Sequence, residues 1–390
     1  MVNVCEGNVQ SFKVGASMDN GGSEVRVLDC QASLDDILKL DNDFVKIREE
    51  DFRIKEVAEP ARLCRILEAP NEEMKGIISQ GLTGKAYDAQ AITISSQSQK
   101  TSNINYYRQV VFALAQNALQ NWLKLGGYSR YSSDCSASKG LLQATIFEYA
   151  VAICIPVREY NGVKDCADIL KNTLAGTYTV EFPLLENSPR LTFELKKENI
   201  GVLPEGGVAI SALKRDLGED EISLLIDMGH LTADIAVFQG TTLLGKVISS
   251  QFAGSTLLAN VRMALADEGY ILSEKQVETV LETKKVRNGK TDVDVTSILE
   301  LCIKRFVSNY LQKDVVQVLN ANAINVKQVQ NFVPLGAPMN NPASNPLIAE
   351  IVECCGLENS EVKLLPGDLR YVNVVSANNF AKLLLKRMKA

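Results

Sequence analysis

The chain has 390 residues, of which 46% are hydrophobic and 23% are charged, and its formal net charge is −6. This length allows two domains with substantial cores, and this balance of apolar and charged residues is ordinary for a globular protein. The negative net charge disfavours direct binding of nucleic acid through a broad basic surface.

The cysteines and the N-terminal residues favour a reducing compartment. Nine cysteines are scattered without a C-x-x-C pair, which is typical of reduced thiols in the cytoplasm. Residues 1–11 lack a basic region followed by an apolar one, so no signal peptide is expected. The longest apolar run, residues 149–157, is too short to span a bilayer. We therefore expect a cytoplasmic protein that has no membrane partner.

Residues 12–30 predict a β-hairpin whose first strand ends at Asp19. A turn built from Gly and Ser exposes backbone N–H groups and a hydroxyl at its tip, which suits a phosphate group. The turn consists of Asn20, Gly21, Gly22 and Ser23. Arg26 follows on the outgoing strand.

The next part of the chain is polar before it becomes helical. Residues 34–78 are mixed and charged, and residues 81–103 are polar and predict surface loops around a short strand at 91–94. Residues 104–123 carry apolar side chains at helical spacing, which predicts a core helix. Residues 128–139 predict an irregular loop.

Strands and helices then alternate, which indicates an α/β sheet. The expected elements are a buried strand at 149–157, a helix at 165–175 and strands at 177–182 and 191–195. A further strand ends at Pro204 and Glu205, before a helix at 208–217. Glu205 has an electrostatic reason to be there, because the beginning of a helix favours negative charge.

Residues 223–239 predict a second β-hairpin, with Asp227 at the inner end of an apolar strand. A carboxylate in that position is costly unless a cation or several donors satisfy it, although Asp also caps turns with its own side chain. The repeat of strand, Asp, flexible turn and strand favours the first interpretation. Two such turns facing each other would clamp a polyphosphate and hold a hydrated Mg²⁺ between Asp19 and Asp227.

The remaining sequence contains one motif that should be rejected. Residues 240–247 nearly match the Walker A pattern, but Val247 replaces the Ser or Thr that binds Mg²⁺. The other expected elements are helices at 257–266, 278–285, 295–319 and 342–355, a strand at 329–335 and a last helix from 373. Ser255 is a candidate N-cap of the first of these helices. The basic residues at 382–389 suit the C-terminal end of a helix.

These features together resemble the actin-like ATPase superfamily, and most closely the bacterial plasmid-segregation actins of the ParM type. The motif that carries the resemblance is Asp-x-Gly-x-x-Thr-x-Asp at 227–234, which contains Gly229, His230, Leu231 and Thr232. His230, the one histidine of the chain, stands where Gly or Ser is more usual and is interpreted as a tolerated turn residue. The resemblance implies an α/β, actin-like (ribonuclease H-like duplicated) fold of two lobes with a nucleotide cleft between them.

The resemblance also implies the division of the chain. Lobe I is expected at 1–204, with its small subdomain at about 35–100 and with the C-terminal helix 373–390 added to it. Lobe II is expected at 205–372, with a small subdomain at about 257–325.

The site residues follow from the same resemblance. Glu205 would position the attacking water, and Asp19 and Asp227 would hold Mg²⁺ through water. The residues implied to contact the nucleotide are those of the two turns together with Arg26, Gly254, Ser255, Glu282, Gly336, Ala337 and Pro338. For Arg26, Ser255 and Glu282 the alternatives of an exposed charge, an N-cap and a solvated charge remain open. A turn with one Gly followed by Ala-Pro departs from the Gly-rich purine turn of the family.

The expected function is that of an ATP hydrolase, with GTP as the alternative nucleotide, that polymerises into dynamic filaments. Such a filament would segregate plasmid DNA through a DNA-binding adaptor protein. The alternatives are a small-molecule kinase of the same fold and a non-polymerising ATPase of the chaperone or activator type.

Overall fold

The computed structural model describes residues 10–20, 24–87, 89–94, 99–126, 145–340 and 345–390. The chain divides into two units, each of which has its own sheet and core. The first consists of Met1–Ile155, Glu159–Pro204 and Val374–Ala390, and the second of Pro156–Arg158 and Glu205–Asn373. The loop expected at 128–139 lies outside the described residues.

The described strands of the first unit form a ten-stranded sheet in the order β3-β2-β1-β8-β10-β9-β5-β6-β4-β7. They are β1 (Gln10–Asn20), β2 (Glu24–Asp29), β3 (Leu38–Asp41), β4 (Asp43–Ile47), β5 (Leu63–Glu68), β6 (Gly76–Gln80), β7 (Ala91–Thr93), β8 (Thr145–Ile155), β9 (Gly176–Glu181) and β10 (Arg190–Pro204). The helices of this part are α1 (Gly81–Lys85), α2 (Ile104–Lys124), α5 (Val157–Gly162), α6 (Cys166–Leu174) and α13 (Val372–Lys389). Segment 35–100 therefore extends the main sheet, because β5 pairs with β9.

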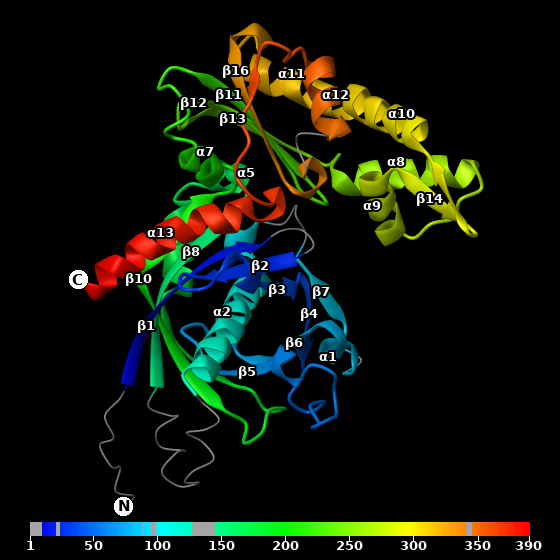
Figure 1. Cartoon of the computed structure of the whole chain (residues 1–390). Coiled ribbons are helices and arrows are strands. Elements are labelled where there is room, and N and C mark those ends of the chain that lie inside the picture. The colour runs from blue at the N-terminus through cyan, green and yellow to red at the C-terminus, as the bar shows by residue number, and fades with distance from the viewer. Residues whose placement is uncertain (1–9, 21–23, 88, 95–98, 127–144, 341–344) are drawn as a thin grey trace, which may run out of the picture. The chain divides into compact units, whose positions relative to one another are not determined.

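The middle strand β8 is buried on both faces. Tyr149, Val151 and Ile153 belong to the core cluster that contains the apolar face of α2. Ala150 belongs instead to a cluster with Leu384 and Leu385 of α13 (Figure 1). Successive side chains of a strand point to opposite faces of the sheet, so α2 and α13 cover opposite faces. This explains why residues 149–157 read as a continuous apolar run.

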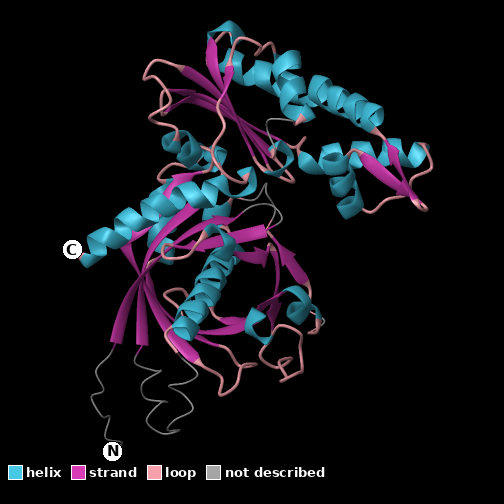
Figure 2. Ribbon diagram, viewed as in Figure 1, coloured by secondary structure: helices cyan, strands magenta, loops and turns pink. Residues whose placement is uncertain are grey.

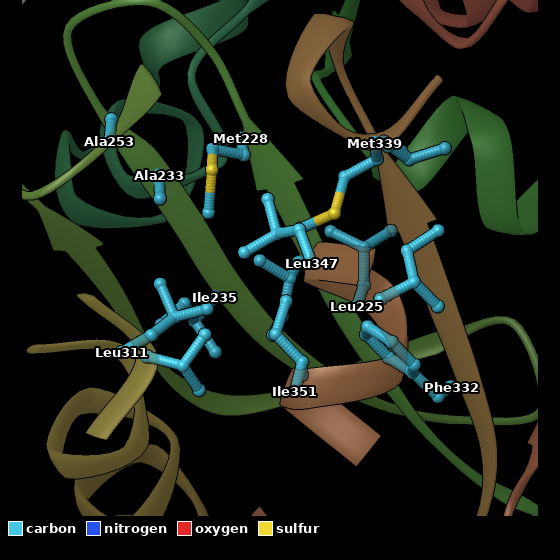
Figure 3. Close-up of a cluster of buried hydrophobic side chains, with 14 of the residues drawn as sticks. Leu225, Met228, Ala233, Ile235, Ala253, Leu311, Phe332, Met339, Leu347 and Ile351 are labelled. Atoms are coloured by element: carbon cyan, nitrogen blue, oxygen red, sulfur yellow. The ribbon is translucent and has the colours of Figure 1, made fainter. Parts of the chain in front are cut away.

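The second unit contains a five-stranded sheet in the order β13-β12-β11-β16-β17 and a separate two-stranded ribbon (Figure 2). Its strands are β11 (Ile222–Met228), β12 (Ala233–Gln239), β13 (Thr242–Ser250), β14 (Lys285–Asn288), β15 (Thr291–Asp294), β16 (Val329–Leu335) and β17 (Glu361–Val362). Its helices are α7 (Gly207–Ala212), α8 (Gly254–Asp267), α9 (Glu274–Thr283), α10 (Thr296–Phe306), α11 (Gln312–Ala321) and α12 (Pro346–Cys355). Leu225 of β11 and Phe332 of β16 lie in the same core cluster as Ile351 of α12 (Figure 3).

The two units repeat one topology. In the first, β3, β2 and β1 form an antiparallel meander, and β8 and β10 continue the sheet parallel to β1. In the second, β13, β12 and β11 form the same meander, and β16 and β17 continue it parallel to β11. Hairpin β1–β2 is therefore the topological equivalent of hairpin β11–β12. The α/β fold expected from the sequence, with its duplication, is confirmed.

Several expected boundaries were wrong. Strand β10 runs without a break from Arg190 to Pro204, with a register shift between Leu195 and Ile200, where two strands were expected. Helix α7 ends at Ala212 instead of continuing to 217. The helices α8 and α9 begin earlier than expected, at Gly254 and Glu274. These errors share a cause, since register shifts and first helical turns leave little trace in hydrophobic periodicity.

The long helix expected at 295–319 is interrupted. Between α10 and α11 the residues Val307–Leu311 form a π-helical turn. Tyr310 in this turn stacks on Phe252, with ring centroids 4.1 Å apart. The helix expected at 342–355 begins at Pro346, because Asn345 is its N-cap and has extended backbone angles.

The seven cysteines among the described residues are free thiols. Burial, with a smaller effect of Cys354, raises the pKa of the Cys355 thiol to about 12. A thiol with a raised pKa is a poor nucleophile at neutral pH, so Cys355 is a packing residue. Among the described helices, none combines the length and apolarity needed to cross a membrane.

Candidate functional site

Hairpin β11–β12 brings two carboxylates together. Asp227 is the penultimate residue of β11 and stands directly opposite Asp234 of β12. Opposed residues in an antiparallel pair have their side chains on the same face of the sheet, and like charges in that position destabilise it. Asp234 is only 7% exposed. An arrangement of this kind favours a cation next to the two carboxylates.

Asp234 was not among the site residues expected from the sequence, although it is the last residue of the motif 227–234. The sequence could have shown its position. Asp227 and Asp234 each lie two residues from the four-residue turn 229–232, and this symmetry places them opposite each other in the hairpin.

Helix α8 holds the turn of this hairpin in place. Within the turn, the Gly229 N–H donates a hydrogen bond to the Thr232 carbonyl at 2.9 Å. The first N–H groups of α8 donate to the turn from outside, Gly254 to the Gly229 carbonyl at 3.1 Å and Ser255 to the His230 carbonyl at 2.7 Å. These two N–H groups stabilise the turn from outside, and the carbonyl groups of the turn satisfy two of the N–H groups that the beginning of a helix leaves without a helical partner.

The structure excludes one of the two interpretations of Ser255, that of an N-cap. The N-cap of α8 is Ala253, so Ser255 lies in the first helical turn and is not the N-cap. A Cβ atom at Gly254 would lie 3.0 Å from the Gly229 carbonyl oxygen and 3.1 Å from Pro338 Cγ. Gly254 is therefore needed for the close approach of α8 to the turn.

The segment after β16 reaches the same place. Gly336 has a φ of +94°, and a Cβ there would lie 2.0 Å from the carbonyl oxygen of Met228. Ala337, Pro338 and Met339 continue as a single 3-10 turn. The hairpin turn, the beginning of α8 and residues 336–338 are thus three segments, distant in sequence, that meet at one edge of the sheet.

His230 has an acidic neighbour from α9. Its Nε2 atom lies 3.5 Å from Oε1 of Glu274, the first residue of that helix. Glu282, the expected ribose-binding acid, lies eight residues further along α9, which is about 12 Å along the helix axis. The structure brings Glu274 and not Glu282 to the turn, and the sequence could not show this because the beginning of α9 was placed four residues too late.

Glu205 is anchored close to Asp227. It follows β10 and precedes Gly206, the N-cap of α7, so it lies just outside the helix and not in its first turn. The Gly206 N–H donates to Oδ1 of Asn373 at 2.9 Å, and Nδ2 of Asn373 donates to Oδ2 of Asp227 at 2.9 Å. One asparagine therefore connects the turn of Glu205 with Asp227.

The first unit contains the equivalent hairpin. Asp19 is the penultimate residue of β1 and is only 3% exposed. It stands opposite Arg26, whose Nη1 lies 3.2 Å from Asp19 Oδ2 and whose Nε lies 2.9 Å from Glu24 Oε2. Arg26 is therefore an ion-pair partner of Asp19 and not an exposed charge. The turn residues Gly21, Gly22 and Ser23 lie outside the described residues, as does the side chain of Asn20.

The donor set fits a hydrated Mg²⁺. In the second unit Asp227 and Asp234 offer carboxylate oxygens, which Mg²⁺ prefers, and Asp19 offers the same type of ligand in the first unit. Within the described parts of the chain, no group of three or more His, Cys, Asp and Glu side chains could enclose a metal ion. Mg²⁺ is usually bound through one or two carboxylates, waters and substrate phosphates, so each hairpin by itself suits a hydrated ion that arrives with a phosphate ligand.

Comparisons with known proteins give matches among solved structures. The actin-like protein Alp7A is 15% identical, with a TM-score of 0.63 over 97% of this chain and 98% of that chain. ParM of Bacillus thuringiensis, solved with ATP, is 11% identical, with a TM-score of 0.57 over 96% of this chain and 99% of that chain. A 15-stranded ParM filament from Clostridium botulinum contains a chain that is 13% identical, with a TM-score of 0.54 over 96% of this chain and 99% of that one.

A scan against protein-family models found no match, and a search of curated proteins also found none. At identities of 11–15% the likeness concerns the fold, and it extends over nearly the whole chain. The resemblance found in the sequence is confirmed at that level: the chain has the actin-like fold of the ParM type.

Proposed function

We propose that the chain is a Mg²⁺-dependent ATP hydrolase, with GTP as the alternative nucleotide. The observation that carries this proposal is the duplication of the Asp-bearing hairpin. Asp19 and Asp227 occupy the same position in two units of the same topology, each one residue before the end of the strand that leads into the turn. Each of the two equivalent turns would bind phosphate groups through its backbone N–H groups.

The proposed roles follow the chemistry of phosphoryl transfer, which depends mainly on positioning and charge stabilisation. Asp19 and Asp227 would hold a hydrated Mg²⁺, which would supply positive charge against the phosphates. Arg26 and the N–H groups of the turns bind phosphate oxygens. Gly254, Ser255 and residues 336–338 provide the sugar and purine side of the site.

Glu205 would orient the attacking water. The water oxygen forms a bond to the γ-phosphorus, and the bond from that phosphorus to the oxygen bridging it to the β-phosphate breaks. The products are ADP and inorganic phosphate, and the proton of the water passes to the phosphate. The contact between the Gly206 N–H and Asn373 supports this role, because it fixes the backbone next to Glu205 close to Asp227.

We further propose that the protein assembles into filaments with bound nucleotide and that hydrolysis leads to disassembly. The support is the likeness of the fold to a ParM filament chain. Segregation of plasmid DNA through a DNA-binding adaptor is the proposed cellular use of such a filament.

The test is light scattering of micromolar protein after addition of Mg-ATP, with phosphate release followed in the same sample. We expect scattering to rise and later to decay as phosphate is released. Replacement Glu205→Ala should lower the rate of phosphate release by about 100-fold, the order of effect expected for loss of a group that positions the nucleophile. Scattering should then persist in this variant.

Glu353→Ala is the matched control, because Glu353 is an exposed carboxylate of α12 outside the site. Phosphate release without scattering, over a wide range of protein and salt concentration, would contradict the filament and direct the search to small hydroxyl substrates of a kinase. No release of phosphate from ATP or GTP by the wild-type chain would contradict the hydrolase itself.

A further inference from the structure

We propose that Asn373 is a positioning residue for nucleotide hydrolysis, which holds the Asp227 carboxylate and the backbone of Glu205 in one arrangement. The inference rests on the proposed hydrolase function. The two equivalent hairpins differ in the residue that stands opposite their first Asp. In the first unit, the residue opposite Asp19 is Arg26, a cation that pairs with it. In the second unit, the residue opposite Asp227 is a second carboxylate, Asp234.

Asn373 provides Asp227 with an orienting donor from another element. Its Nδ2 atom donates to Asp227 Oδ2 and its Oδ1 atom accepts from the Gly206 N–H, both at 2.9 Å. A carboxylate only accepts and a backbone N–H only donates, so these two partners allow one orientation of the amide. Hydrogen bonds to charged groups are also the stronger ones.

The position of Asn373 in the chain gives this contact further significance. Asn373 is the last residue of the second unit before the chain continues into the first, and Gly206 is the second residue after the chain enters the second unit. The next residue, Val374, accepts a hydrogen bond at 2.7 Å from Ser17, which lies two residues before Asp19 on β1. Two consecutive residues in the first turn of α13 are thus hydrogen-bonded to different strands. Asn373 is bonded to the strand of Asp227, and Val374 to the strand of Asp19.

Asn373 would therefore affect hydrolysis without touching the nucleotide itself. Asn373 sets the distance between the metal-binding carboxylate and the residue that orients water, and it does so through two ordinary hydrogen bonds. Groups that hold the ligands of a metal in place affect activity by about 10- to 100-fold when removed. An error in position of this kind should lower kcat and leave nucleotide binding nearly unchanged.

The decisive variant is Asn373→Asp, which keeps the shape and the acceptor but loses the donor. At neutral pH the new carboxylate would repel Asp227, Asp234 and Glu205, the acidic groups of β11, β12 and the turn before α7. We expect kcat to fall by about 10- to 100-fold. The KM for ATP should change by less than about threefold.

Asn373→Ala removes both bonds and should show a similar loss of kcat. The control is Asn322→Ala, because Asn322 also bridges two elements with its amide: it donates to the Lys246 carbonyl at 3.0 Å and accepts from the Lys246 N–H at 2.9 Å, away from the site. Circular dichroism checks that each variant is folded. Hydrogen exchange of the Gly206 N–H, which should become faster in Asn373→Ala, reports the contact independently of activity.

The outcomes separate the two proposals. If the wild-type chain hydrolyses ATP and both Asn373 variants hydrolyse it as fast as Asn322→Ala, the positioning role is overturned and the proposed function stands. A loss of kcat in Asn373→Asp that is accompanied by an equally large rise in the KM for ATP would also overturn the role, since it would indicate damage to nucleotide binding and not a loss of positioning. If the wild-type chain hydrolyses no nucleotide, the proposed function is overturned and the positioning role with it.

Discussion

Gly336 shows at the scale of one residue how closely the backbone segments of the site approach each other. Its φ of +94° disfavours any side chain, and a Cβ atom would lie 2.0 Å from the Met228 carbonyl oxygen. Gly336→Ala therefore has to displace either the turn or the end of β11, which carries Asp227. We expect a loss of at least about 3 kcal/mol in the free energy of unfolding, measured with urea, because a backbone overlap adds to the strain.

Gly367 provides the matched control for this substitution. Its φ is +92°, almost the same, but a Cβ atom there would meet nothing within 4 Å. Gly367→Ala should thus show the backbone strain alone, about 1–2 kcal/mol. Equal losses in the two variants would show that the close approach of Gly336 to Met228 has no energetic effect.

The residues of the site differ in how far the sequence could predict them. Asp227, its turn and Glu205 belong to short local motifs, so their types and spacing were visible. Asn373 acts through partners at positions 206 and 227, and no local pattern indicates pairs so distant in sequence. The contact between His230 and Glu274 was missed for a different reason, because it depends on where a helix begins.

At the scale of elements, the sequence predicted those that have a regular apolar pattern. The helix α2 and the hairpin β11–β12 were expected almost at their observed bounds. Strand β10 was divided because Lys196, Lys197 and Glu198 interrupt its apolar pattern, where the structure has a register shift. The π-helical turn Val307–Leu311 was not predicted, since one additional residue in a long helix hardly changes its periodicity.

The contact of α13 with the sheet leads to a prediction about two elements. The side chain of Phe380 packs where β10 carries Gly201, and a Cβ atom there would lie 2.4 Å from Phe380 Cε1. We expect Gly201→Ala to lower the free energy of unfolding by about 1–3 kcal/mol through overpacking. In the double variant with Phe380→Ala this loss should largely disappear. Urea unfolding of the four proteins gives the coupling energy, and additive losses would contradict the contact.

At the scale of the whole molecule, the sequence indicated the duplication through its two hairpins alone. The shared strand order of the two sheets depends on pairings such as β1 with β8, which are distant in sequence. The strands of segment 35–100 that extend the sheet, other than the one expected at 91–94, were not predicted, because the charged pattern of this segment conceals them. The resemblance to the actin-like superfamily compensated for this, since it implied the fold as a whole.

The duplication leads to a prediction about nucleotide binding. If each unit contributes one carboxylate to the same Mg-nucleotide, Asp19→Asn and Asp227→Asn should each reduce its binding, and the double variant should lose little more than either single one. A ligand at 100 times its Kd stabilises a protein by about 2.7 kcal/mol. We therefore expect Mg-ATP to raise the Tm of the wild-type chain and of the control Asp267→Asn, which changes an exposed residue of α8. The increase should be small in both site variants, and in the wild-type chain when EDTA removes the metal.

An undiminished increase in Asp19→Asn, with none in Asp227→Asn, would mean that the second unit binds the nucleotide by itself. The equivalence of the two hairpins would then be topological and not functional.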